Sequence, residues 1–144
     1  MGAELATMLV ANSATVEAFV HCAAVVNPLP ARLADYAATV ETFNVNYLSA
    51  QQIVTSLLKK KVNHGKLHSI VFVSSVSSLH GVKGFSLYSA SKSAVDGMMR
   101  ALASKLAPEV RVNSVLPGAI RTRSFIQHAK TMGCLLYTSD AADE

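Results

Sequence analysis

The stretch "SIVFVSSV" (residues 69–76) is a run of β-branched and apolar residues broken only by serines near its ends. A run of strand length without polar alternation is typical of a strand that is buried on both faces of a parallel sheet. Apolar residues recur at helical spacing on either side of this run, from Ala34 to about Lys61 and from about Ser86 to Leu106. Both flanking segments are predicted to be helices that cross over the sheet.

Two further runs of strand length extend the pattern in both directions. They are "VEAFVHCAAV" (16–25) and "VRVNSVLPG" (110–118), and residues 1–12 look like the end of a preceding helix. The order β-α-β-α-β predicts an α/β fold with a partial Rossmann-like, doubly wound parallel sheet and helices on both faces. Ligands of such sheets bind beyond the carboxyl ends of the strands, so we expect the functional site at that edge.

Small and polar residues follow each of the three runs. The segments are His21-Cys22-Ala23-Ala24 after the first run, Ser74-Ser75 after the second and Pro117-Gly118 after the third. Small side chains allow a ligand to approach the backbone closely.

The segment "YSASK" (88–92) places Tyr88 and Lys92 four positions apart near the start of a predicted helix. At this spacing the two side chains share a helix face, with their Cβ atoms roughly 6 Å apart. A free tyrosine ionises only near pH ~10, but a neighbouring ammonium favours the phenolate and so suits it to general acid/base chemistry. The motif alone is weak, because this spacing also occurs by chance.

Ser75 strengthens the catalytic interpretation, because it lies at the end of the central strand and precedes Tyr88 by one glycine-containing loop. Its hydroxyl could bind a substrate carbonyl while the tyrosine transfers the proton. An alternative is equally consistent with these residues: Ser74 and Ser75 could merely satisfy backbone groups where the strand ends.

Taken together, the residues from about Ala18 to Thr122 resemble the short-chain dehydrogenase/reductase family. The resemblance rests on "SIVFVSSVSSLHG" (69–81) and on "YSASKSAVDGMMRALASKLAPEVRVNSVLPGAIRT" (88–122), which occur in the order and spacing of the family. It implies an NAD(P)-dependent oxidoreductase that transfers hydride between a nicotinamide and a carbonyl or alcohol carbon of a small molecule. The protein would supply position and electrostatics to chemistry that belongs to the cofactor.

The resemblance also implies roles for single residues. Tyr88 is then the general acid/base, Lys92 assists it and binds the nicotinamide ribose, and Ser75 holds the substrate oxygen. Asn46, in "FNVNYLSA", matches an asparagine at a helix kink that positions a water in the proton relay. From the residues alone, an asparagine fixed to nearby backbone is the favoured interpretation of Asn46.

The cofactor-binding set implied by the resemblance is Ala23, Tyr88, Lys92, Pro117, Gly118, Ile120 and Thr122. "HCAA" matches the family's Asn-Asn-Ala-Gly turn with Ala23 at the alanine position, but Ala24 replaces the glycine. Ile120 and Thr122 would contact the nicotinamide carboxamide. Without the resemblance, "PG" at 117–118 is only a strand stop.

Composition limits the other classes of function. The chain has 144 residues, 51% of them hydrophobic and 15% charged, which predicts one globular domain. The net charge of +4 does not indicate a nucleic-acid partner, because Lys59, Lys60 and Lys61 are expected at a solvated helix end without interleaved aromatic residues. No apolar run has the ~20 residues of a membrane span. Two cysteines form neither a disulfide framework nor a metal cluster, and a cytoplasmic protein is expected.

Several family features are missing from the sequence. We find no glycine-rich turn for a pyrophosphate and no specificity residue that would choose between NAD and NADP. We therefore expect a fragment truncated at both ends and inactive by itself, with a catalytic segment at 1–133 and a non-native read-through tail at 134–144. The intact parent is expected to be a homodimer or homotetramer.

Two alternatives to a dehydrogenase remain open at this point. One is a non-catalytic α/β scaffold or dimerisation module, against which the joint presence of Ser75, Tyr88 and Lys92 counts. The other is an epimerase of the extended branch, which shares the Tyr-x-x-x-Lys pattern. It ranks lower because "NSVLPGAIRT" (113–122) resembles the shorter oxidoreductase branch.

Overall fold

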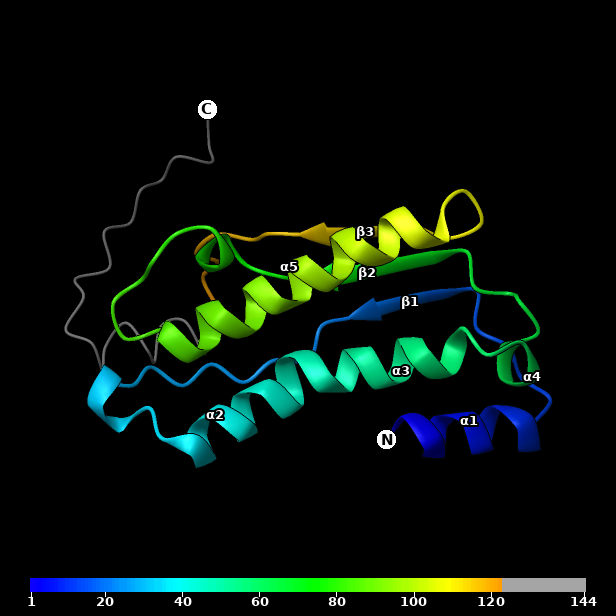
Figure 1. Cartoon of the computed structure of the whole chain (residues 1–144), viewed down its shortest axis with the longest axis horizontal. Coiled ribbons are helices and arrows are strands. Elements are labelled where there is room, and N and C mark those ends of the chain that lie inside the picture. The colour runs from blue at the N-terminus through cyan, green and yellow to red at the C-terminus, as the bar shows by residue number, and fades with distance from the viewer. Residues whose placement is uncertain (123–144) are drawn as a thin grey trace.

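The computed structural model describes residues 1–122, so the expected boundary between residues 133 and 134 lies outside the described residues. Three parallel strands form one sheet in the order β1-β2-β3 (Figure 1). They are β1 (Ala18–His21), β2 (Ser69–Val73) and β3 (Arg111–Val115). The α/β class and the parallel sheet are thus confirmed, although each strand is shorter than its apolar run.

One helix precedes β1, and the other helices lie in the connections between the strands. The α-helices are α1 (Gly2–Ala11), α2 (Tyr36–Phe43), α3 (Ser49–Leu57), α4 (Lys60–Asn63) and α5 (Ser86–Leu106). Short 3-10 helices, η1 (Ala31–Leu33) and η3 (Val76–Ser78), lie in the loops that follow β1 and β2. Helix α5 has the bounds that the sequence predicted.

The single helix expected from Ala34 to Lys61 is wrong in two respects. Helix α2 begins after Asp35, whose carboxylate caps it by accepting from the Ala38 amide, and a π-helical segment, η2 (Asn44–Leu48), separates α2 from α3. Helix α3 then ends at Leu57, and Lys59 has an extended backbone before α4 begins. Lys59 therefore lies at the break between α3 and α4, and Lys60 and Lys61 begin α4, a feature that helical periodicity does not encode.

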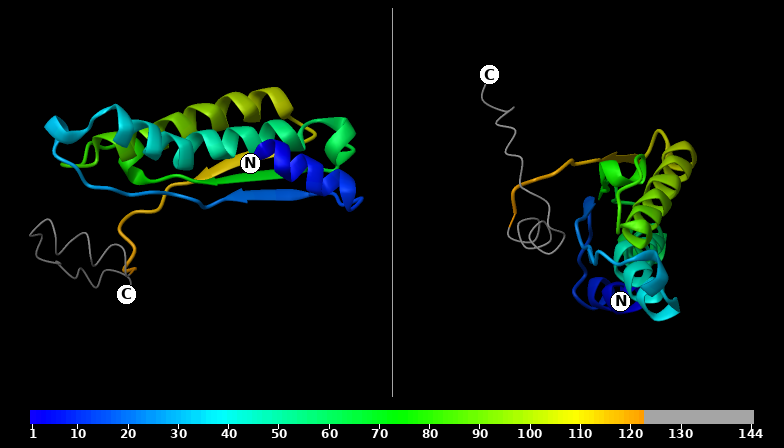
Figure 2. Two further views of the ribbon diagram at one scale, coloured as in Figure 1. Left: turned by 90° about the horizontal axis from the view of Figure 1, so that it is seen from below. Right: turned by 90° about the vertical axis from the view of Figure 1, so that its left-hand side faces the viewer.

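Within the described residues the helices cover one face of the sheet, whereas the sequence predicted helices on both faces (Figure 2). The side chains of β2 reflect this difference. Ile70 and Phe72 point to the helices and are fully buried, while Val71 and Val73 on the other face are half-buried. The prediction of a central strand fully buried on both faces is therefore wrong for the described part of the chain.

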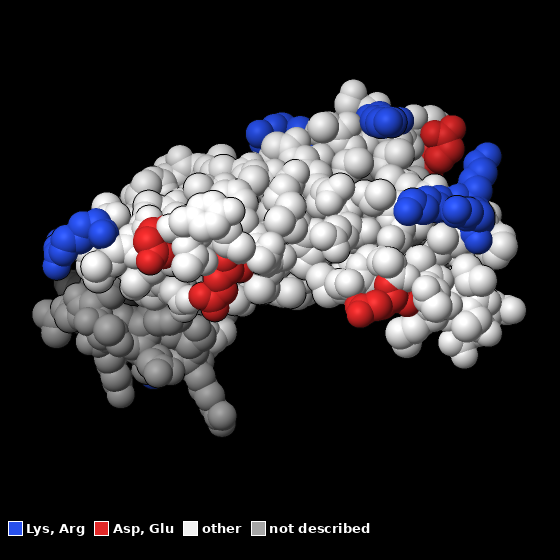
Figure 3. Space-filling model, turned by 60° about the horizontal axis from the view of Figure 1, so that its bottom comes forward, with Lys and Arg blue, Asp and Glu red and all other residues white. Residues whose placement is uncertain are grey.

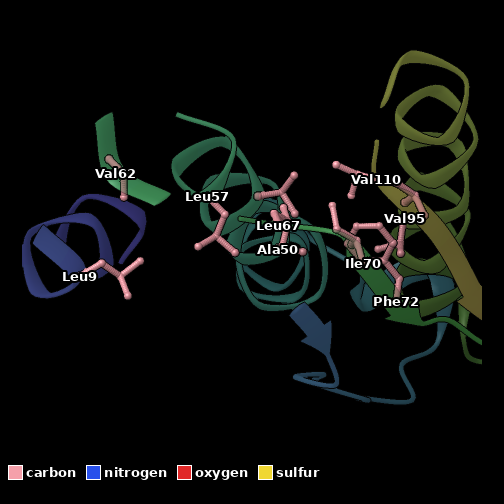
Figure 4. Packing of buried hydrophobic residues seen from close by; sticks show 11 residues of the cluster. Leu9, Ala50, Leu57, Val62, Leu67, Ile70, Phe72, Val95 and Val110 are labelled. Atoms are coloured by element: carbon pink, nitrogen blue, oxygen red, sulfur yellow. The ribbon is translucent and has the colours of Figure 1, made fainter. Parts of the chain in front are cut away.

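The core lies between that sheet face and the helices (Figure 4). Phe72 and Ile70 of β2 contact a layer that includes Val95 of α5 and Ala50 of α3, all with an exposed fraction of 0%. Leu9 of α1 and Val62 of α4 extend the cluster beyond α3. The cluster fixes α5 and α3 against the sheet and so sets the position of every residue on them.

Two buried asparagines bind the backbone on either side of β1. Asn63 accepts from the Val16 amide at 2.6 Å and donates to the Val16 carbonyl at 2.8 Å. Asn46 repeats this pattern at Val25, with distances of 2.7 and 3.0 Å. Both asparagine side chains are completely shielded from solvent.

The surface carries its charges in separate groups. On the face shown in Figure 3, basic side chains lie at the two ends and along the upper edge, and the centre of the face is uncharged. No helix among residues 1–122 is both long enough and apolar enough to cross a membrane.

Candidate active site

The carboxyl edge of the sheet gathers the segments that the sequence singled out. The Ser74 amide donates to the Val115 carbonyl at 2.8 Å, and the Val76 amide donates to the Pro117 carbonyl at 3.1 Å. The chains leaving β2 and β3 therefore run together past the ends of the strands. On the other side, the Leu29 amide donates to the Gly84 carbonyl at 2.8 Å, which joins the loop after β1 to the loop before α5.

Tyr88 and Lys92 lie in the first turns of α5, above this edge. The ammonium nitrogen of Lys92 is 5.7 Å from the centre of the Tyr88 ring and donates to the Val73 carbonyl at 2.7 Å. Phe85 packs edge-on against Tyr88 with ring centroids 6.2 Å apart. Lys92 thus links the tyrosine to the last residue of β2, next to the two serines.

The charge on Lys92 is held in an unusual environment, because only 2% of its surface is exposed. Burial lowers the pKa of Lys92, and the carboxylate of Asp96 and the sulfur of Cys22 oppose that shift. His21 lies close enough to feel the same ammonium: burial lowers the pKa of His21, and the positive charge of Lys92 lowers it further. His21 and Lys92 are therefore two buried groups that could each carry a positive charge, and the charge on Lys92 disfavours a charge on His21.

Ser75 makes the backbone contact that the structural alternative predicted, whereas Ser74 bonds a carboxylate. The Ser75 hydroxyl accepts from the Ser77 amide at 3.2 Å and so caps η3, and Ser75 is 9% exposed. The Ser74 hydroxyl donates to Oδ2 of Asp96 at 2.9 Å. Both hydroxyls are thus engaged at the end of β2, and a substrate-binding role for Ser75 stays a prediction.

Asn46 lies within the π-helical segment, where the Ser49 amide bonds back to the Asn44 carbonyl. Its side chain donates to Ser91 Oγ at 2.9 Å in addition to its two bonds with Val25. The amide is therefore fixed to backbone, as the residues alone suggested, and the kink implied by the resemblance coincides with Asn46. Its role in a proton relay stays a prediction.

The residues expected to bind a nicotinamide line the same edge. Ala23, Gly118, Ile120 and Thr122 are exposed, whereas Pro117 is half-buried. A methyl group built on Gly118 would meet no atom of residues 1–122 within 4 Å, so these residues leave the backbone there open to a ligand. The Thr122 amide donates to the Ile120 carbonyl at 2.7 Å. An exposed edge of small residues is compatible with a flat ring that stacks against the backbone.

A match to a known family decides how this arrangement is interpreted. The family model for short chain dehydrogenases matches residues 3–133. The chain belongs to the short-chain dehydrogenase/reductase family.

Two curated relatives show how much of a family member is represented. The 1,2-dihydroxy-1,2-dihydronaphthalene dehydrogenase of Pseudomonas putida is 46% identical over 84 residues, which are 57% of this chain and 31% of that protein. The human mitochondrial dehydrogenase/reductase SDR family member 2 is 34% identical over 107 residues, 72% of this chain and 38% of that protein. The matched part of the chain thus spans about a third of the length of these two short-chain dehydrogenases/reductases.

Solved structures of the family share the fold. One, provisionally described as an NAD(P) dependent gluconate 5-dehydrogenase from Beutenbergia cavernae with bound NADP at low occupancy, is 29% identical, with a TM-score of 0.80. The match covers 92% of this chain and 53% of that one. Another is provisionally described as a short chain dehydrogenase from Escherichia coli CFT073 complexed with NADPH. It is 26% identical with a TM-score of 0.78, and the match covers 90% of this chain and 54% of that one.

Two buried polar residues of this short-chain dehydrogenase/reductase, Ser91 and Asp96, were not singled out in the sequence, and His21 was named only as part of the segment after the first strand. Ser91 Oγ accepts from Asn46 and donates to the Tyr88 carbonyl at 2.7 Å, and Nε2 of His21 is 2.9 Å from Ser49 Oγ. Asp96 could have been found from its spacing, because it lies four positions after Lys92 on the same predicted helix. The sequence carried no comparable signal for His21.

A cavity of about 400 Å³ lies elsewhere, between the end of α3 and the segments that enter β2 and β3, and is lined by Leu57, Leu67 and Val110 among others. It is at the amino-end edge of the sheet, opposite Tyr88 and Lys92. This cavity is therefore separate from the candidate site, which is defined by the chemistry of its residues.

Proposed function

We propose that this chain carries the proton-transfer part of an NAD(P)-dependent oxidoreductase that acts on the carbonyl or alcohol carbon of a small molecule. The observation that carries the proposal is the position of Lys92, which reaches from α5 to the Val73 carbonyl while its ammonium lies 5.7 Å from the Tyr88 ring. This arrangement unites a phenol, a cation and the strand end that bears Ser75. The family relationship supports the same reaction class.

In this proposal each residue acts at a stated atom. The hydroxyl of Tyr88 gives or takes the proton of the substrate oxygen, and the Lys92 ammonium lies 5.7 Å from the centre of its ring. The hydroxyl of Ser75 is within the chain segment that would face the same oxygen, and it can donate to that oxygen while it still accepts from the Ser77 amide. A nicotinamide, when bound, supplies or accepts the hydride.

The nicotinamide end of a cofactor fits the residues at the edge. Gly118 leaves its backbone uncovered and Ala23 is exposed, whereas the Lys92 ammonium is buried and donates to the Val73 carbonyl. The related structures that contain NADP or NADPH support a cofactor of this class. The 144 residues contain no glycine-rich turn for a pyrophosphate. We therefore infer that the chain alone binds dinucleotides weakly and is inactive by itself, while the choice between NAD and NADP is not encoded in these residues.

A cytoplasmic location, a small-molecule substrate and a homo-oligomeric parent belong to the same proposal. The non-catalytic scaffold is retained as a second candidate on one observation. The side chains of Ser75 and Asn46 are both engaged in bonds that hold the fold together. A scaffold would need those bonds but would not need Tyr88.

A chimera tests the enzymatic proposal. Residues 18–122 replace the corresponding segment of the Pseudomonas putida dehydrogenase, and oxidation of the diol in that relative's name is followed by the absorbance of the reduced nicotinamide. Tyr88→Phe should lower turnover by about 10²–10⁴-fold, the usual contribution of a general acid/base, because only the hydroxyl is removed. Tyr36→Phe is the matched control, since the Tyr36 side chain is 83% exposed on α2 and turnover should not change.

Equal turnover in the Tyr88→Phe and wild-type chimeras would remove Tyr88 from the mechanism. A folded chimera that binds cofactor but does not turn over would favour the scaffold. Titration of the 144-residue chain itself with NADH and with NADPH tests the inference about dinucleotide binding, and tight binding of either cofactor would contradict it.

A further inference from the structure

Asp96 is a buried acid that the reaction described above does not use. Its exposed fraction is 4%, and Oδ2 accepts from the Ser74 hydroxyl at 2.9 Å. Among the described residues, Oδ1 has no hydrogen-bond partner. A buried carboxylate with a vacant oxygen is costly unless an opposite charge lies nearby, so its retention in the core requires a reason.

The opposite charge is Lys92, which lies one helical turn before Asp96 on α5. Lys92 is as deeply buried as Asp96, and its ammonium donates to an uncharged carbonyl, that of Val73. The carboxylate favours the protonated form of the lysine, in opposition to burial. The other titratable groups around the ammonium are Tyr88 on α5, His21 at the end of β1 and Cys22 directly after it.

The same carboxylate also holds the end of β2. Its partner Ser74 sits directly before Ser75, and the Ser74 hydroxyl is also 3.4 Å from the Lys92 carbonyl. The bond between Asp96 and Ser74 therefore ties α5 to the backbone next to Ser75. One carboxylate thus reaches both elements that carry the candidate catalytic residues.

We propose that Asp96 is a positioning residue of the site: its carboxylate is the buried counter-ion of Lys92 and anchors Ser75 through Ser74. The inference rests on the proposed function, because it assigns Asp96 a role in the same site. It does not require turnover to be observed, since the charge state of Lys92 can be measured directly in the purified chain.

The test compares the titration of Lys92 in matched variants by NMR of protein labelled with ¹³C at lysine Cε, with the Lys92 signal assigned by its loss in Lys92→Arg. All variants carry Cys22→Ser, so that the nearby sulfur does not contribute. Asp96→Asn removes the charge but keeps an oxygen that can accept from Ser74. Ser74→Ala removes the hydrogen bond but keeps the charge.

We expect Asp96→Asn to shift the titration midpoint of Lys92 downward, and Ser74→Ala to leave it closer to the parent value. An unchanged midpoint in Asp96→Asn would overturn the proposal, as would an equal shift in Ser74→Ala. If circular dichroism shows that Asp96→Asn does not fold, Asp96→Ser replaces it with the same expectation. Because no cofactor or substrate enters this experiment, its failure is distinguishable from failure of the proposed reaction.

Discussion

The buried imidazole of His21 shows how one side chain can couple stability to pH. Ser49 Oγ donates to the Val45 carbonyl at 2.6 Å, so it accepts from Nε2 of His21 and the neutral ring carries its proton there. Nδ1 is then a buried acceptor without a partner among the described residues. A proton on Nδ1 would have no acceptor among the described residues, and the charge that it brings would be repelled by Lys92.

This environment predicts that the protein loses stability below neutral pH. The pKa of His21 is lowered from 6.5 in the folded protein, whereas the unfolded chain titrates near 6.5, so the unfolded state binds the proton first as pH falls. The stabilising contribution is complete above about pH 6.5. It is lost as pH falls through the folded-state value.

Urea unfolding at pH 7 and pH 5 measures this difference. His21→Gln should reduce the decrease in unfolding free energy between the two pH values. Phe19→Leu is the control, because Phe19 lies on the same face of β1 without a titratable group and should change both values equally. An undiminished decrease in His21→Gln would show that other groups cause it.

Predictability at this scale depends on whether a contact is local. The proximity of Tyr88 and Lys92 follows from helix geometry alone and is confirmed by the 5.7 Å between ammonium and ring. The contact of His21 with Ser49 depends on which face of β1 meets α3. A shift of one residue in strand register would reverse that face, so the sequence could not fix it.

At the scale of elements, the π-helical segment η2 sets the position of Asn46 between β1 and α5. The segment inserts one residue into the helical repeat, so the helix faces before and after it are offset. Periodicity predicted the extent of α5 because that helix is regular, but it missed η2 and the end of α3. The position of η2 is tied to the tertiary hydrogen bonds of Asn46, which the spacing of apolar residues does not report.

Replacing Asn46 should therefore destabilise the junction of these elements. Asn46→Ala removes three hydrogen bonds and leaves the Val25 amide and carbonyl without their partner. We expect a loss of about 1–3 kcal/mol in unfolding free energy, the usual cost of orphaned buried polar groups. Chemical denaturation measures it.

Asn44→Ala is the matched control, since Asn44 lies in the same π-helical segment but is exposed. It tests whether the loss arises from the bonds or from helix propensity. A similar loss in both variants would show that propensity within η2, and not the bonds to Val25 and Ser91, accounts for the effect.

At the scale of the whole molecule, the sheet has one buried and one open face in the described residues. The β-α-β-α-β order sufficed to predict the parallel sheet, because crossover helices of this length permit few other topologies. It did not predict which faces would be covered. Burial of a strand depends on every element packed on the sheet, and a run of valines is compatible with either outcome.

The two faces should respond differently to truncation of a side chain. Phe72→Ala should lower the unfolding free energy by about 3–5 kcal/mol, because Phe72 is fully buried at the centre of the core. Val20→Ala on the open face should change it by about 0.5 kcal/mol or less, since the Val20 side chain is 55% exposed. Equal losses in urea denaturation would mean that the open face is covered in solution.

The two asparagines that bracket β1 have a consequence for that short strand. A carboxamide offers the same donor and acceptor as a peptide group, so Asn63 and Asn46 each imitate one rung of a neighbouring strand. A shift of β1 by one residue in register would break the hydrogen bonds of Asn63 with Val16 and those of Asn46 with Val25 at the same time. The asparagines of α4 and η2 therefore hold the two ends of the four-residue strand β1, which keeps it in one register.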